Sequence, residues 1–312
     1  MTFKNYIFLW DLSGDLFYKK FGISILRFKF MIMAFFLSRE VGLLLQYRKN
    51  VAVKNLILER PETLGAIIWP YQCNTWDAKT RLSHIAEHYN AIEDLKFKIA
   101  FPLDGALKLL DLTNVYKGLH IVLDQPKWFM REGQLVINLF LDKTRILSLA
   151  FSFARESGKV VAYIGAIQGR NFDWSLDLNR DLTKAMHGMR PRDFLFEQFR
   201  TLCRTVGVSK IYAVSNASRH HLDSYFGKKN EKRELALNYD EVWIERGGIL
   251  EDSDFYVFSM NLQKKNIQQI PAKKRSMYRR RYEFLETTEV RTQEVCVHLD
   301  SDKLLEYPFS SL

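Results

Sequence analysis

The sequence predicts an α+β protein in which a helical N-terminal region packs on a mixed, mostly antiparallel sheet. Apolar residues recur at helical spacing through roughly the first hundred residues. Four runs rich in β-branched and aromatic residues follow between Gly118 and Ile167, and then a helix and a strand in the order of a β-α-β crossover. We expect residues 1–115 to form the helical region, 116–262 an α/β core and 263–312 a basic C-terminal segment.

Composition restricts the class of protein. The chain has 312 residues, 47% of them hydrophobic, which is enough for a full core. Cys73, Cys203 and Cys296 lie far apart and show no metal-ligand spacing, so we expect reduced thiols rather than disulfides. The N-terminus does not have the pattern of a signal peptide. The expected location is the cytoplasm, either free or peripherally at the inner membrane.

Three helices are predicted in the N-terminal region. The first begins at Ser38 and runs to Leu58, the second follows Asp77, and the third follows Pro102 and runs to Leu110. The apolar run Phe28–Leu37 is too short to span a bilayer, so it packs inside the protein or lies on a membrane surface. We favour burial, because short apolar runs usually belong to a core.

The central strands form an antiparallel meander, since the last three runs are joined by the turn sequences DKT and ESG. A helix then begins at Pro191 and ends at Gly207, and the strand Lys210–Val214 follows. This crossover predicts that the fourth and fifth strands are parallel. Glu241–Ile244 and Phe255–Phe258 are predicted as further strands.

The segment from Ile167 to Arg192 is longer than a simple connector and leads to a helix start. A helix N-terminus offers free N–H groups and a positive dipole end, which suit a phosphate or pyrophosphate. The alternative is an exposed basic turn. The residues that this segment brings to the helix start are Lys184, His187, Gly188, Arg190 and Arg192.

Two further stretches of the sequence match patterns that can have a function. HIAEH, at 84–88, matches a zinc-protease pattern, but no third ligand follows it, and we predict no metal site. The stretch 263–282 has eight basic residues and no acidic one, so it predicts a partner-binding helix or, alternatively, a solvated helix face. The predicted contact residues are Lys273, Lys274, Arg275, Tyr278, Arg279, Arg280 and Arg281.

The meander and crossover resemble the core of the GCN5-related N-acetyltransferase fold, in which the pyrophosphate of acyl-CoA lies on the helix N-terminus. SNASRHHLDSYFG resembles that family's fifth-strand Asn followed by a helix with a general-acid tyrosine. The compact QxxGxG/A signature for pyrophosphate is missing, and so are the two helices expected between the first and second strands. The resemblance is therefore one of topology. It implies that Gln168, Gly169 and Asn216 contact the donor and that Tyr225 is the acid. For Tyr225 the alternative is a core aromatic.

Several longer motifs resemble the VirK/YbjX family. They are REGQL (131–135), IGAIQG (164–169), LTKAMHGMRPRDFL (182–195), AVSN (213–216), YDEVWIERGG (239–248) and KKRSMYRRRY (273–282). This resemblance implies a bacterial protein linked to virulence and to antimicrobial-peptide resistance, with no settled activity.

The leading hypothesis is an acyltransferase at the cytoplasmic side of the envelope that uses an acyl-CoA or acyl carrier protein donor, with no tightly bound cofactor. Such a transfer needs a base, for which His187 is the first candidate and Asp240 or Glu241 the reserve. The rival hypothesis is a non-enzymatic factor whose basic helix docks on an anionic membrane or an acidic partner. Nucleic acid is not expected, because no recognition motif is present.

Overall fold

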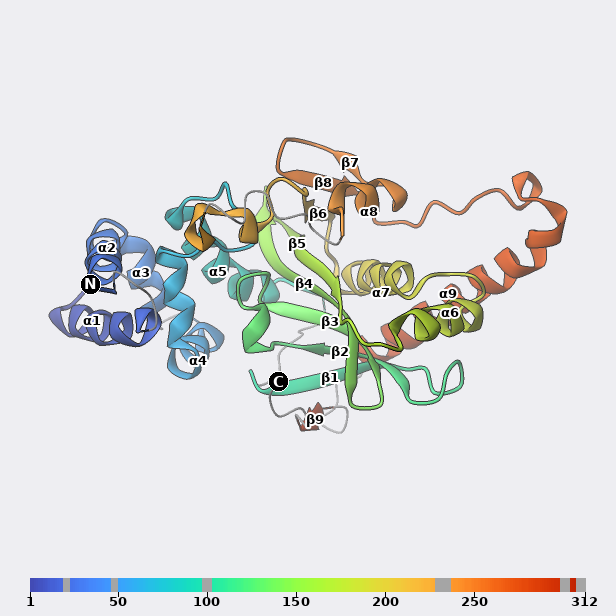
Figure 1. Cartoon of the computed structure of the whole chain (residues 1–312), viewed down its shortest axis with the longest axis horizontal. Helices are drawn as coiled ribbons and strands as arrows, with labels where there is room; N and C mark the ends of the chain where they lie inside the picture. Colours follow the sequence, from blue (N-terminus) through green and yellow to red (C-terminus); the bar gives the residue numbers. More distant parts are fainter. Residues whose placement is uncertain (19–22, 46–49, 97–102, 228–236, 298–303, 307–312) are drawn as a thin grey trace.

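The computed structural model describes residues 1–18, 23–45, 50–96, 103–227, 237–297 and 304–306. Within these residues nine strands form one sheet in the order β7-β8-β6-β5-β4-β3-β2-β1-β9 (Figure 1). All neighbouring strands are antiparallel except β5 and β6, which are parallel. The predicted α+β class, with a mixed and mostly antiparallel sheet, is confirmed.

Helices precede the sheet, and α1 to α4 lie at one end of the molecule (blue in Figure 1), while α5 packs against the sheet. They are α1 (Phe3–Phe17), α2 (Ile23–Phe36), α3 (Ser38–Leu45), α4 (Val51–Glu59), the 3-10 helix η1 (Pro61–Ile67) and α5 (Ala78–Ile92). The helix expected from Ser38 to Leu58 is thus two helices, α3 and α4. Asp77 caps α5 as predicted, because its carboxylate accepts a hydrogen bond from the Thr80 N–H at 2.7 Å.

The helix predicted after Pro102 was wrong. Pro102 itself lies outside the described residues, and Gly105–Asp111 forms strand β1, antiparallel to β2. Both faces of β1 are covered, since Ala106 packs with Val122 and Phe140 while Leu107, Leu109 and Leu110 belong to the main core, and a bulge interrupts the strand after Lys108. Such a strand lacks the apolar–polar alternation of a half-exposed strand, and its apolar residues happen to match the helical period. The helical N-terminal region therefore also contributes a strand to the sheet.

The meander is confirmed. Its strands are β2 (Leu119–Asp124), β3 (Leu135–Leu141), β4 (Thr144–Glu156) and β5 (Lys159–Gly169). A bulge interrupts the β4–β5 pairing, because Ala150 pairs with Ala166 and Phe151 with Ile164, which leaves Gly165 without a partner. A Cβ atom at Gly165 would lie 2.0 Å from the Glu132 carbonyl oxygen, so the bulge requires glycine.

The crossover that follows is also confirmed. The long connection after β5 contains helix α6 (Ser175–Ala185), and then α7 (Pro191–Val206) leads to β6 (Lys210–Val214). Gly207 ends α7 with a φ of 88°, a left-handed conformation that glycine adopts without strain. β5 pairs with β6 only from Val161 to Ile164, so the last part of β5 extends beyond its parallel neighbour.

The strand predicted at Glu241–Ile244 was wrong, because helix α8 (Tyr239–Glu245) occupies this segment. Its N-cap is Asn238, whose side chain accepts from the Asp240 N–H at 3.0 Å. The Trp243 indole is buried and donates to the Val214 carbonyl at 2.8 Å. Strands β7 (Ile249–Leu250) and β8 (Phe255–Phe258) follow, and the second of these was predicted.

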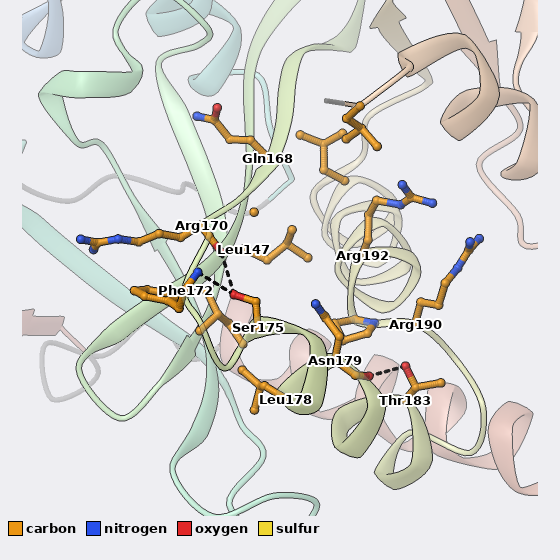
Figure 2. Close-up of a pocket in the computed structure, with 15 residues that line it drawn as sticks. Leu147, Gln168, Arg170, Phe172, Ser175, Leu178, Asn179, Thr183, Arg190 and Arg192 are labelled. Carbon is orange, nitrogen blue, oxygen red and sulfur yellow. Dashed lines mark hydrogen bonds between the residues drawn. The ribbon is translucent and has the colours of Figure 1, made fainter. Parts of the chain in front are cut away.

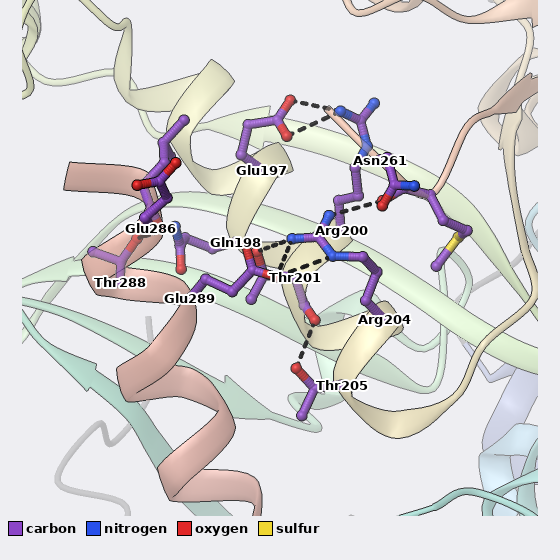
Figure 3. Close-up of polar contacts among 12 residues, drawn as sticks. Glu197, Gln198, Arg200, Thr201, Arg204, Thr205, Asn261, Glu286, Thr288 and Glu289 are labelled. Carbon is purple, nitrogen blue, oxygen red and sulfur yellow. Dashed lines mark hydrogen bonds and ion pairs between the residues drawn. The ribbon is translucent and has the colours of Figure 1, made fainter. Parts of the chain in front are cut away.

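From β8 the chain runs to the end of the molecule opposite α1 and returns through η6 (Ile267–Gln269) and α9 (Ala272–Val297) (Figure 1). Helix α9 packs against α7 and β1, and β9 (Leu304–Glu306) pairs with β1. Figure 3 shows the polar layer between α7 and α9, in which Arg204 pairs with Glu289 at 2.7 Å and the Gln198 amide donates to Thr288 at 2.9 Å. These contacts fix the position of the basic helix.

Helix α2 is not buried as a whole. Phe30 and Ala34 are fully buried, but Phe28, Ile32 and Phe35 are exposed. The expected burial of this apolar run therefore applies to one face of the helix only. Within the described residues, no helix is both long and apolar enough to cross a membrane.

Candidate functional site

A cavity of about 420 Å³ lies where β5 leaves the sheet and α7 begins (Figure 2). Its lining combines apolar side chains from β4, β5 and α6 with the polar ends of β5 and α7. We call it the strand-end cavity. The lining residues are Ile146, Leu147, Ile167, Gln168, Gly169, Arg170, Phe172, Ser175, Leu178, Asn179, Thr183, Arg190, Pro191, Arg192 and Leu237.

The strand-end cavity brings together four of the predicted donor-binding residues. Gln168 and Gly169 end β5, while Arg190 and Arg192 flank Pro191 at the start of α7. Figure 2 shows the two arginines on the side opposite Gln168. Arg190 is the N-cap residue and its side chain makes no capping hydrogen bond. The start of α7, with its positive dipole end, and two arginines therefore border one hollow.

Both arginines already have carboxylate partners. Glu245 of α8 lies 2.6 Å from Arg190 and 3.3 Å from Arg192, and Asp193 lies 2.8 Å from Arg190. The hydrogen bond with Arg190 lowers the pKa of the Glu245 carboxyl below its usual value. Arg190 is nevertheless about half exposed, 48% of its side chain. A bound phosphate would compete with Glu245 for these two cations.

A tyrosine hydroxyl occupies the edge of β5 beside the cavity. Tyr239 of α8 donates to the Ile167 carbonyl at 3.1 Å and accepts from the Ile167 N–H at 2.9 Å. The Tyr239 N–H in turn donates to the Asn216 side chain, and the Asn216 N–H donates to the Asp240 carboxylate at 2.8 Å. Asn216 and Asp240 thus hold α8 in place, and neither lines the strand-end cavity.

The turn between α6 and α7 faces α9. The His187 ring lies 6.0 Å from the ring of Phe284, and its pKa is lowered by burial and by Arg280 and Arg281. A Cβ atom at Gly188 would lie 2.8 Å from the Met277 sulfur. Lys184 is exposed on α6. The structure therefore places Lys184, His187 and Gly188 outside the lining of the strand-end cavity.

Tyr225 also lies outside the lining of the strand-end cavity. The α-helix expected around it is absent from the described residues, where His220–Leu222 and Ser224–Phe226 form the short 3-10 turns η3 and η4. Asp223 between them accepts from the Tyr225 N–H at 2.7 Å, which favours a turn over a continuous helix. The Tyr225 ring lies 5.7 Å from the Arg131 guanidinium and packs against the N-terminal helices.

A second hollow, of about 620 Å³, lies between α7, α8 and α9. Arg190 lines both hollows. Six basic side chains surround this second hollow, together with three acidic ones. The basic residues are Arg190, Arg200, Arg246, Lys265, Lys274 and Arg281, and the acidic ones are Asp193, Glu197 and Glu245.

The predicted partner-binding residues of α9 divide into two groups. Arg275 donates to the Ile270 carbonyl at 2.9 Å, and Arg281 donates to the His187 carbonyl at 3.1 Å while stacking on Tyr278. These three residues therefore support the local structure. The exposed residues are Lys273, Lys274, Arg279 and Arg280.

A buried contact between a carboxyl group and an imidazole was not predicted from the sequence. Glu132 Oε1 lies 3.4 Å from His220 Nε2. Burial raises the pKa of Glu132 to about 7 and lowers that of His220 to about 3, so at neutral pH the imidazole is uncharged. Glu132 belongs to the motif REGQL, but the burial that makes it unusual depends on distant segments of the chain.

The histidines of HIAEH have structural contacts. His84 Nε2 lies 2.9 Å from the Ser152 hydroxyl, and His88 Nδ1 accepts from the Phe153 N–H at 2.9 Å. Burial lowers the pKa of both imidazoles to about 3. Both therefore connect α5 to β4. In the part of the chain that the structure describes, no three His, Cys, Asp or Glu side chains gather in a way that could hold a metal ion.

Known proteins are similar in sequence to this chain. A family model described as a protein of unknown function (DUF535) matches residues 23–294. An uncharacterized protein of Haemophilus influenzae is 29% identical over 224 residues, which cover 70% of this chain and 72% of that protein. The uncharacterized protein YbjX of Escherichia coli is 27% identical over 144 residues, which cover 46% of this chain and 43% of that protein.

No solved structure matches the chain, so the resemblance to the acetyltransferase fold stays a prediction. The family match covers far more than half of the sequence. The chain therefore belongs to the DUF535 family, and the expected relationship to VirK/YbjX proteins is confirmed.

Proposed function

We propose that the protein is an acyltransferase that binds a phosphate-bearing acyl thioester, such as acyl-CoA or acyl carrier protein, in the strand-end cavity. The observation that carries the proposal is the combination of an uncapped helix N-terminus, Arg190 and Arg192 with an apolar lining in one hollow. Phosphates would bind the arginines, and the apolar part of the donor would lie against residues such as Phe172 and Leu178.

In such a transfer the attacking amine or hydroxyl forms a bond to the thioester carbonyl carbon, and the carbon–sulfur bond breaks. The proton of the attacking group goes to a base, and the thiolate takes up a proton. His187, Tyr225 and Asp240 are the predicted proton carriers, and none of them lines the cavity. Donor binding, rather than proton transfer, is what the geometry supports.

We further propose that the protein acts at the cytoplasmic side of the envelope, where acyl-CoA and acyl carrier protein occur. Modification of lipid or peptide there would connect the activity to the virulence and antimicrobial-peptide resistance that the VirK/YbjX resemblance implies.

Thermal unfolding of the purified protein with CoA, acyl-CoAs or acyl carrier protein tests donor binding. A donor at a hundred times its Kd should stabilise the fold by about 2.7 kcal/mol. Arg190→Ala combined with Arg192→Ala should abolish this shift. Arg180→Ala is the matched control, because this arginine is exposed on α6, pairs with Asp177 and does not line the cavity.

Glu245→Gln gives an independent check. This substitution removes the carboxylate that the two arginines share and leaves Asp193 beside them, so donor affinity should rise. The proposal fails if no donor raises the Tm, or if the double arginine variant responds as the wild type does.

The second candidate function is a non-enzymatic factor that docks through α9. It is favoured by the exposure of Lys273, Lys274, Arg279 and Arg280 on one segment. Docking through exposed charges should weaken steeply as salt rises, because the Debye length is about 8–10 Å near physiological ionic strength. Binding to anionic vesicles or to acyl carrier protein, measured across a salt series, distinguishes this function from binding in the strand-end cavity.

A further inference from the structure

The first two helices expose an unusual number of large apolar side chains. On α2 the exposed residues recur at helical spacing and form one stripe, with Ile25 74% exposed and Phe35 63% exposed. Soluble proteins rarely expose contiguous apolar surface of this extent without a partner. We call these side chains the hairpin stripe: Phe3, Ile7 and Trp10 of α1 with Ile25, Phe28, Ile32, Phe35 and Phe36 of α2.

The two halves of the hairpin stripe adjoin each other. The ring centroids of Trp10 and Phe28 are 5.9 Å apart, and those of Tyr6 and Phe35 are 6.5 Å apart. These two contacts run in opposite order along the helices, so α1 and α2 are antiparallel. The two helices lie together at one end of the molecule (Figure 1), and these ring contacts join their exposed apolar faces.

The opposite face of α2 packs against the N-terminal core. Phe30 is fully buried, with its ring 6.0 Å from that of Phe17, and Ala34 is fully buried. The exposed stripe is therefore an additional apolar face on a helix whose other face completes the N-terminal core. A helix of a soluble protein ordinarily presents polar residues on its outer side.

Within the described helices α1 and α2, basic side chains beside the hairpin stripe outnumber acidic ones by three to two. Both charged residues of α2, Arg27 and Lys29, are basic. Arg27 donates to the Trp10 carbonyl at 3.0 Å and lies 4.1 Å over the Trp10 ring, whereas Lys29 is exposed. Helix α1 adds exposed Lys4 and two carboxylates, Asp11 and Asp15. Aromatic side chains beside lysines and arginines are typical of segments that lie at the headgroup level of a bilayer.

We propose that the α1–α2 hairpin lies flat on an anionic lipid bilayer, with the hairpin stripe inserted at the boundary between headgroups and acyl chains. Neither helix crosses the bilayer. The alternative occupant is a second copy of the chain, and the experiment below separates it from a bilayer through self-association. The proposal concerns a surface remote from the strand-end cavity and does not rest on the proposed function.

Vesicle flotation with the full chain tests the proposal, using phosphatidylcholine alone and phosphatidylcholine mixed with phosphatidylglycerol. The wild type should float with the mixed vesicles and less with the neutral ones. Ile32→Ser combined with Phe35→Ser should weaken binding at least about tenfold, because a buried side chain of this size is worth that factor or more. Both positions are exposed, so the fold should be retained, as thermal unfolding will show.

Two further variants serve as controls. Leu176→Ser with Ile249→Ser removes two apolar side chains elsewhere that are more exposed, 79% and 75%, than Ile32 and Phe35, and should float like the wild type. Lys273→Glu with Lys274→Glu separates the hairpin from the basic helix α9. The proposal is overturned if the stripe variant floats like the wild type, or if only the α9 variant loses binding. It is also overturned if the stripe variant abolishes self-association while no form of the protein floats.

Discussion

The two ends of the molecule carry opposite kinds of surface. At the α1–α2 end the exposed residues are mostly apolar, whereas at the opposite end the chain entering α9 is densely basic (Figure 1). An apolar surface contributes free energy in proportion to the area it buries and is little affected by salt, whereas exposed charges are screened. If both ends bind an anionic surface as proposed, they would do so through different physical forces, and salt and mutation would separate their contributions.

The largest expected effect is at the apolar end and tests whether α2 has two distinct faces. Phe30→Ala should destabilise the protein by about 3–5 kcal/mol, because it empties a fully buried site against Phe17. Phe35→Ala, on the exposed face, should change stability by less than about 0.5 kcal/mol. Urea unfolding measures both. Equal losses would show that both faces of α2 are core, and the contrast between the two ends would disappear.

The next effect lies between the two ends, where Glu132 joins the N-terminal half to the sheet. Its folded-state pKa of about 7 exceeds the ordinary 4.5, so its stabilising contribution is complete below about pH 4.5 and is lost as pH rises through 7. Glu132→Gln should remove that loss. The free energy of unfolding of the variant, relative to that of the wild type, should therefore rise by about 2–3 kcal/mol from pH 5 to pH 8.

Urea unfolding at the two pH values measures this difference. His84 and His88 are buried in both proteins and cancel in the comparison, while His220, Arg131 and Arg219 are the ionisable neighbours of the carboxyl. A difference that is the same at both pH values would show that Glu132 is ionised throughout.

A smaller effect tests how the basic end is held. Thr288→Val removes the hydroxyl that accepts from the buried Gln198 amide, which should cost about 1–2 kcal/mol. Thr287→Val is the matched control, because this neighbouring threonine is exposed. If the two variants were equally stable, the hydrogen bond between Gln198 and Thr288 would not contribute to holding α9 in place.

The smallest effect on stability is expected from the exposed cations. Arg279→Ala with Arg280→Ala should change stability by less than about 0.5 kcal/mol, yet elute from a cation exchanger at lower salt. Lys117→Ala with Lys159→Ala removes the same charge from dispersed exposed sites. If both pairs elute together, the positive charge of α9 does not act as a concentrated surface.

The sequence was most informative where local pattern decides the structure. The meander, Pro191, Gly207 and the parallel strand Lys210–Val214 follow from runs of β-branched residues and from helix start and stop signals, which depend on neighbours in the chain. β1 and α8 were assigned the wrong element. In β1 burial on both faces removes the alternation, and in α8 the capping side chain of Asn238 outweighs a short apolar pattern.

The same distinction applies to the site. Gln168, Gly169, Arg190 and Arg192 could be placed together, because a crossover brings the end of one strand to the start of the next helix. His187, Tyr225 and Asn216 could not be placed, since their directions depend on α9, on Arg131 and on α8, respectively. The exposed face of α2 could not be predicted either, because an apolar run does not show which of its residues pack against the rest of the protein.

Tyr239 has a consequence for the rate of binding. Its hydroxyl satisfies both backbone groups of Ile167, so it occupies the place that an extended ligand would take along the edge of β5. A ligand that pairs with this strand can bind only after the Tyr239 hydroxyl has released the Ile167 N–H and carbonyl. Its observed association rate should then level off at high ligand concentration, at the rate of withdrawal, and a Tyr239→Phe variant should bind faster. Tyr239 would in this way act as an intramolecular competitor of the ligand.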